Sequence, residues 1–114
     1  MPATDKIKNI TSAAASIRQA QASLMQASRL CSDPVKSAKI FAEYNHLDSA
    51  LTQLLHTLAI TDDAAFSAAT TLLKQSAQSF QSDQTQLQAI IDDAKTAASV
   101  VSYITQAVGF IMKL

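Results

Sequence analysis

The chain has 114 residues, the length of one ordinary domain, and its nine basic residues balance its nine acidic residues. One glycine and two prolines are too few for the tight turns that a β-rich fold of this length requires. Alanine and glutamine, which favour helices, are abundant, so the composition predicts a single all-α domain over residues 1–114. A net charge of zero provides no field that attracts nucleic acid, so we expect no nucleic-acid partner.

The charges are unevenly distributed along the chain. Residues 1–40 carry a net charge of +4 and residues 41–114 a net charge of −4. We interpret this split as a basic first helix that packs against the acidic remainder of the same molecule. The first fifteen residues include Asp5, Lys6 and Lys8, where a signal peptide has an apolar core. We therefore expect the protein to be cytoplasmic, or exported without a conventional signal peptide.

The first two predicted helices cover about residues 5–31 and 35–59. Ser32-Asp33-Pro34 separates them, because aspartate caps a helix and proline suits the first helical position. In both helices apolar or small side chains recur at steps of three and four residues, as expected for a helix with one core-facing side. In the second helix the repeat has no exception and comprises Ile40, Tyr44, Leu47, Leu51, Leu54 and Leu58, with Phe41 and Leu55 widening the stripe.

The third predicted helix covers about residues 62–112 and follows a start signal at Thr61-Asp62-Asp63. Its apolar heptad repeat is broken only by Ser76 and Asp83, a pattern typical of a coiled coil. At 1.5 Å per residue this helix is roughly 75 Å long, and the first two, at about 40 Å, cover only half of it. The sequence thus predicts an antiparallel bundle of three helices whose uncovered seam binds another chain through Leu87, Ile90, Ala94, Val101, Ile104, Val108 and Ile111.

The alternative architecture is a closed bundle of four helices with a turn near residues 81–84. Four polar residues in a row and a capping box from Asp83 and Gln86 favour this turn. The absence of Gly or Pro and the unbroken heptad phase favour the continuous helix. In the continuous helix Asp83 is a polar seam residue that sets register, and in the closed bundle it begins a helix at the turn.

Residues 96–112 carry no charge and are bracketed by Lys95 and Lys113. The segment is shorter than the roughly 20 apolar residues of a spanning helix, and it contains Thr, Ser, Tyr and Gln. We interpret it as a core helix. Membrane contact is the less favoured alternative.

No residue pattern indicates catalysis, a metal or another cofactor. Glu43 and His46 have the Glu-x-x-His spacing of carboxylate-bridged metal bundles, but Glu43 is the only glutamate in the chain. We interpret the two as an exposed polar pair. Cys31, at a predicted helix C-terminus, lies where the helix dipole disfavours a thiolate, and no glycine-rich loop is present to hold a phosphate.

These observations favour a non-enzymatic protein that acts through helix packing, either as a homo-oligomer such as a dimer or with another helical protein. The chain, poor in glycine and rich in Ser, Thr, Gln and Ala, resembles small components, chaperones and adaptors of bacterial secretion machines in composition, without a shared motif. A membrane-active, pore-forming type of protein that uses residues 96–112 is one alternative. An immunity or inhibitor protein that binds one target is another.

Overall fold

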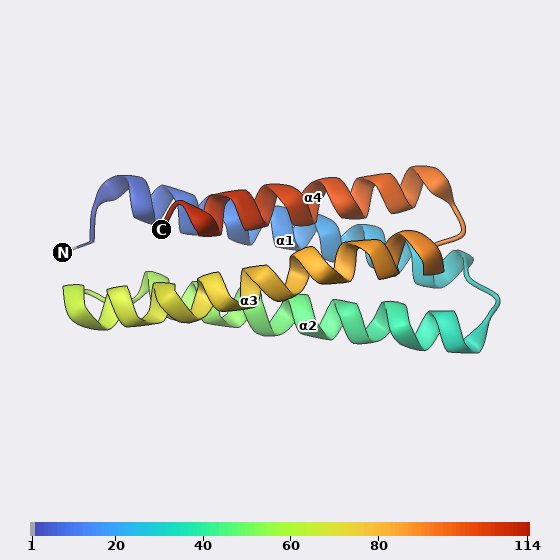
Figure 1. The fold of residues 1–114 in the computed structure, drawn as a ribbon, viewed down its shortest axis with the longest axis horizontal. Coiled ribbons are helices and arrows are strands. Elements are labelled where there is room, and N and C mark those ends of the chain that lie inside the picture. The colour runs from blue at the N-terminus through green and yellow to red at the C-terminus, as the bar shows by residue number, and fades with distance from the viewer. Residues whose placement is uncertain (1) are drawn as a thin grey trace.

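The computed structural model describes residues 2–114 and contains four helices: α1 (Thr4–Leu30), α2 (Pro34–Leu58), α3 (Asp63–Ile90) and α4 (Ala94–Met112). They run antiparallel to their neighbours in an elongated bundle that measures 48 × 20 × 20 Å (Figure 1). The prediction of an all-α antiparallel bundle is confirmed.

The helices form a square in which α1 contacts α2 and α4, and α3 contacts α2 and α4. α1 and α4 are the most closely packed pair, whereas α2 and α3 are the least closely packed. Ala13, Ala20 and Ala27 of α1 are buried at heptad spacing, and small side chains of this kind let two helix backbones approach. The looser contact between α2 and α3 leaves room for larger polar side chains.

Three of the four helices begin with an aspartate cap. A carboxylate oxygen of Asp33 accepts hydrogen bonds from the backbone N–H groups of Val35 (2.9 Å) and Lys36 (3.4 Å) at the start of α2. Asp62 accepts one from Ala65 at 2.8 Å, as its position in the sequence predicts. Such caps satisfy N–H groups that have no partner inside the helix, which explains why these helices begin where they do.

The predicted continuous helix over residues 62–112 is wrong. α3 ends at Ile90, the chain turns through residues 91–93 with Ile91 and Asp93 in extended conformations, and Asp93 caps α4 by accepting a 2.9 Å hydrogen bond from the Thr96 N–H. A turn near residues 81–84 is also wrong, because Asp83 lies in the middle of α3. The heptad phase did not reveal the turn because apolar or small residues continue at seam spacing across it, at Leu87, Ile90 and Ala94.

Folding back buries most of the seam that was predicted to bind another chain. Leu87, Ile104, Val108 and Ile111 lie in the core of the same bundle, Ile90 and Val101 are half-buried, and Ala94 is exposed. The seam was assigned to a partner because three helices could not cover it. Four helices cover one another, so that reason no longer holds.

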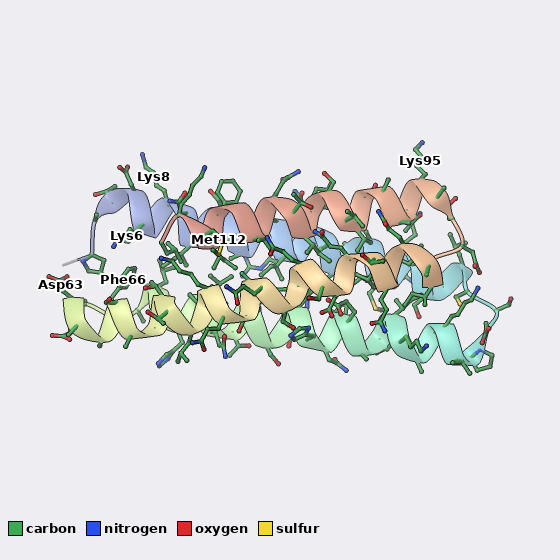
Figure 2. The ribbon with its side chains drawn as sticks, viewed as in Figure 1. Lys6, Lys8, Asp63, Phe66, Lys95 and Met112 are labelled. Atoms are coloured by element: carbon green, nitrogen blue, oxygen red, sulfur yellow. The ribbon has the colours of Figure 1, made fainter. Side chains whose placement is uncertain are left out.

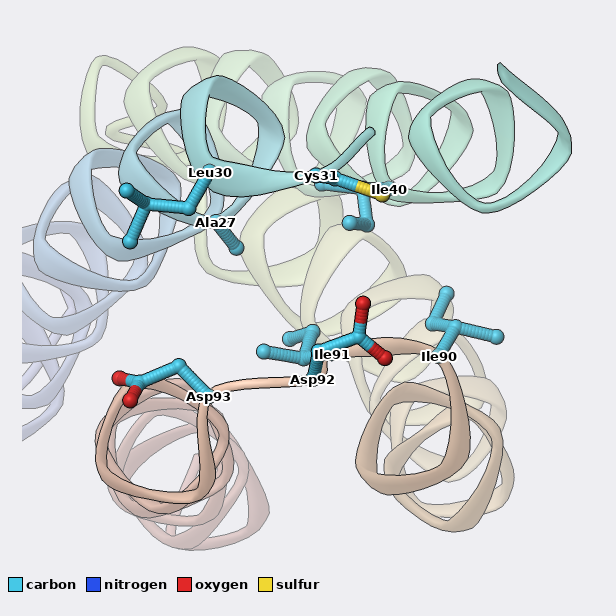
Figure 3. Close-up of a pocket in the computed structure, with 8 residues that line it drawn as sticks. All are labelled: Ala27, Leu30, Cys31, Ile40, Ile90, Ile91, Asp92 and Asp93. Atoms are coloured by element: carbon cyan, nitrogen blue, oxygen red, sulfur yellow. The ribbon is translucent and has the colours of Figure 1, made fainter. Parts of the chain in front are cut away.

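The turn between α3 and α4 lies beside the turn between α1 and α2 at one end of the bundle. A cavity of about 260 Å³ lies between them. Figure 3 shows Cys31 and Ile40 on one side of it and Ile90 and Asp92 on the other. The Lys36 ammonium pairs with the Asp92 carboxylate at 2.9 Å, which joins the basic and acidic parts of the chain. Figure 2 shows Lys6 and Asp63 at the opposite end of the bundle.

Candidate functional site

The polar cluster of the molecule lies between α2 and α3 and consists of Glu43, His46 and Asp83. Nδ1 of His46 is 3.1 Å from Oδ2 of Asp83 and 3.9 Å from Oε1 of Glu43. One nitrogen or oxygen atom from each of the three residues lies within 4.8 Å of the other two. Residues 37 positions apart in the sequence are thus brought into direct contact by the antiparallel pairing of the two helices.

Glu43 points into the core because of its position on α2. It precedes Leu47 by four residues and follows Ile40 by three, and both of these side chains are almost completely buried. The Glu43 side chain is only 11% exposed, and its Oε1 atom is fully buried without a hydrogen-bond partner among the described residues. A buried oxygen without a partner costs free energy, so its presence in an otherwise apolar core calls for a physical explanation.

His46 and Asp83 form the more accessible side of the cluster. Their side chains are 38% and 24% exposed. The imidazole ring of His46 packs at a tilted angle against the buried ring of Phe80, with 4.3 Å between the ring centroids. Asp83 lies on the apolar seam of α3 between Phe80 and Leu87, so its carboxylate faces α2.

The environment of Glu43 changes its protonation. Burial, followed by the negative charge of Asp83 and a hydrogen bond with it, raises the pKa of Glu43 to about 8. At neutral pH the Glu43 carboxyl is therefore mostly protonated and donates to the Asp83 carboxylate. Among the described residues, neither carboxyl has a lysine or arginine within ion-pair distance.

The interpretation of Glu43 and His46 as an exposed pair is wrong for Glu43. The sequence contained the relevant signal, because Glu43 follows the same three- and four-residue steps as Ile40, Leu47 and Leu54. Asp83 was recognised as a polar residue on a seam, but its partner on α2 could not be identified. That assignment requires the alignment of α2 against α3, which depends on where both turns lie.

A second feature is a row of apolar side chains on the outer side of α2. We call it the outer α2 seam; its members follow one another at steps of three and four residues and are Phe41, Tyr44, Asp48, Leu51, Leu55 and Leu58. Phe41, Leu55 and Leu58 are 47%, 43% and 38% exposed, whereas Tyr44 and Leu51 are half-buried against the core. The seam thus lies beside the buried stripe of α2 and is only partly covered by α1.

The outer α2 seam has one charged member, Asp48, near its middle. The Asp48 carboxylate accepts a 3.2 Å hydrogen bond from the side-chain amide of Gln21 on α1, and this amide also donates to the Tyr44 carbonyl at 3.3 Å. Asp48 is nevertheless exposed, so its charge remains available at the surface. The rings of Phe41 and Tyr44 contact each other with 6.2 Å between their centroids.

Comparisons with protein-family models, with curated proteins and with solved structures gave no match for this chain. Among the helices of residues 2–114, none is both long enough and apolar enough to cross a membrane. The uncharged segment 96–112 instead contributes Val100, Ile104 and Ile111 to the core.

Proposed function

We propose that this protein is a non-enzymatic interaction module that binds a helix of another protein along the outer α2 seam. The observation that carries the proposal is the regular spacing of partly exposed apolar side chains along one side of α2. A coiled-coil partner presents its own side chains at this spacing. The buried stripe of α2 already satisfies the bundle, so the fold itself does not require a second stripe.

The exposed part of the seam is large enough to contribute to binding. Phe41, Leu55 and Leu58 together expose on the order of 250 Å² of apolar surface, which corresponds to roughly 6 kcal/mol at 25 cal/mol per Å² if fully covered. The loss of translational freedom on association offsets much of this gain. Because a Kd of 1 μM requires about 8 kcal/mol, we expect weaker binding from these three side chains, in the high-micromolar to millimolar range.

The charge of Asp48 favours a different protein over a second copy as the occupant. Two copies that pair antiparallel through this seam place their Asp48 carboxylates near each other at the centre of the interface, where like charges repel. A partner helix with apolar residues at heptad spacing and one central lysine or arginine matches the seam in both shape and charge. The compositional resemblance to secretion components makes exported helical proteins the first class of partner to screen.

Two synthetic helical peptides test the proposal by fluorescence anisotropy. Both have leucine at heptad positions, and they differ only in a central lysine or glutamate placed opposite Asp48. We expect the lysine peptide to bind at least tenfold more tightly, and the double variant Phe41→Ser with Leu55→Ser to lose binding.

The matched control is Leu72→Ser on α3, which removes an apolar side chain that is 59% exposed and lies outside the seam. This variant should bind the lysine peptide as the unmodified protein does. Absence of binding, or equal weakening in the control and the seam variant, would overturn the proposal. A stable dimer in light scattering that dissociates in the seam variant would show that the occupant is a second copy.

A further inference from the structure

We propose that Glu43, His46 and Asp83 form a binding site for one divalent transition-metal ion, with Zn²⁺ as the best match to the donor set. Two donors come from α2 at the Glu-x-x-His spacing, and the third comes from α3. This inference is independent of the outer α2 seam, because the cluster lies between α2 and α3 whereas the seam borders α1.

The separations of the donor atoms suit a small cation. Donors placed about 2.1 Å from Zn²⁺ at the corners of a tetrahedron lie roughly 3.4 Å from one another. The distances from Nδ1 of His46 to the two carboxylate oxygens, 3.1 and 3.9 Å, lie on either side of this value. All three donor atoms lie within 4.8 Å of one another, so changes in side-chain torsion angles bring them around one ion without movement of the helices.

The buried Oε1 atom of Glu43 provides a second, independent indication of a ligand. It is fully buried and receives no hydrogen bond from any described residue. It lies 3.9 Å from Nδ1 of His46. A cation bound at this face gives the oxygen the partner that the protein itself does not supply. It also supplies positive charge between two carboxyl groups that, in the part of the chain the structure describes, have no lysine or arginine within ion-pair distance.

The surroundings hold the ligands in place while leaving access from solvent. Glu43 and His46 are fixed by one helix, Asp83 lies in the middle of another, and the buried Phe80 ring supports the imidazole. Ligands on rigid helices lose little conformational freedom when an ion binds. The partial exposure of His46 and Asp83 provides a path for entry and an open fourth position for water or a ligand from a partner.

The donor set also selects among metals. Ca²⁺ takes six to eight oxygen donors and Mg²⁺ requires an octahedral shell of oxygens, so neither suits a site with one imidazole and two carboxylates. An imidazole together with carboxylates suits zinc and its first-row neighbours, and four-coordination with an open position is typical of Zn²⁺.

The experiment uses purified full-length protein treated with chelator and then dialysed. Titration calorimetry with Zn²⁺ should show one ion per chain, and Co²⁺ as a spectroscopic probe should give the visible absorption of a four-coordinate ion. Asp83→Asn and His46→Gln should each weaken Zn²⁺ binding at least 100-fold. Zn²⁺ at a hundred times its Kd should raise the melting temperature by roughly 10 °C, and this shift should be absent in both variants.

His56→Gln is the matched control, because it removes the other histidine of α2, which is exposed and lies outside the cluster. Zn²⁺ binding that is unaffected in this control and lost in the two cluster variants supports the site. Absence of stoichiometric binding, equal loss in the control, or displacement of Zn²⁺ by equimolar Mg²⁺ overturns it. The Co²⁺ spectrum of Glu43→Gln gives a further check, since loss of one ligand should change the absorption even where the fold is unaffected.

Discussion

Replacement of Glu43 by leucine should stabilise the metal-free protein. The Glu43 side chain is 11% exposed, and its Oε1 atom is buried without a hydrogen-bond partner among residues 2–114, a situation that typically costs about 1–3 kcal/mol. Leucine has a similar size and fits among Ile40, Leu47 and the other buried side chains. The variant loses one hydrogen bond to Asp83, worth about 1 kcal/mol. We therefore expect a net gain in the free energy of unfolding of roughly 0–2 kcal/mol below pH 4.5, where the carboxyl is protonated in both the folded and the unfolded state.

The gain should increase with pH. The pKa of Glu43 is raised to about 8 in the folded protein, above its ordinary value of 4.5, so the folded state retains the proton more strongly than the unfolded state. Stability from this group is fully present below pH 4.5 and is lost as pH rises through 8. Between these values the free energy of unfolding should fall by at most about 1.4 kcal/mol per pH unit. The titratable groups that face the Glu43 carboxyl are His46 on the same helix and Asp83 on α3.

Urea unfolding of chelator-treated protein at pH 5, 7 and 9 measures both effects. Glu43→Gln serves as the comparison, because it retains a buried polar group but does not titrate. It should remove the dependence on pH that is due to this residue without the gain that leucine provides. The reasoning is refuted if Glu43→Leu lowers the free energy of unfolding by more than 1 kcal/mol, or if Glu43→Gln retains the full pH dependence of the unmodified protein.

Four further substitutions test the helix boundaries and the core, with urea unfolding as the measurement. Asp93→Ala should lower the free energy of unfolding by about 1 kcal/mol because it removes the cap of α4. Asp92→Ala should lower it by less, since the ion pair of Asp92 with Lys36 is exposed. Equal effects of the two variants would contradict the assigned turn. Gly109→Ala should stabilise the protein by about 0.5–1 kcal/mol, because an added Cβ meets no atom within 4 Å; a loss would show that this face is packed. Ile104→Ala should cost about 2–5 kcal/mol because Ile104 is completely buried; a cost below 1 kcal/mol would place α4 outside the core.

A helix start could be predicted from its capping residues only where the heptad repeat did not continue across the turn. Asp33-Pro34 and Asp62-Asp63 predicted helix starts correctly, whereas Asp92-Asp93, the same kind of signal, was not recognised as a start. The heptad repeat continued across residues 87–97 and outweighed the cap. Helical periodicity indicates which side chains face a core. It does not indicate whether two successive core-facing side chains belong to one continuous helix or to two helices joined by a turn.

The sequence alone determined the helical class, the antiparallel packing and most of the buried stripe of each helix, because these follow from composition and from local spacing. It also contained both polar seam residues, Glu43 and Asp83, without showing that they meet. The position of the last turn decides whether the residues after Leu87 face a partner or their own bundle. The alignment of α2 with α3 decides whether Asp83 lies beside His46. Both depend on contacts between residues far apart in the chain, and only the tertiary structure specifies such contacts.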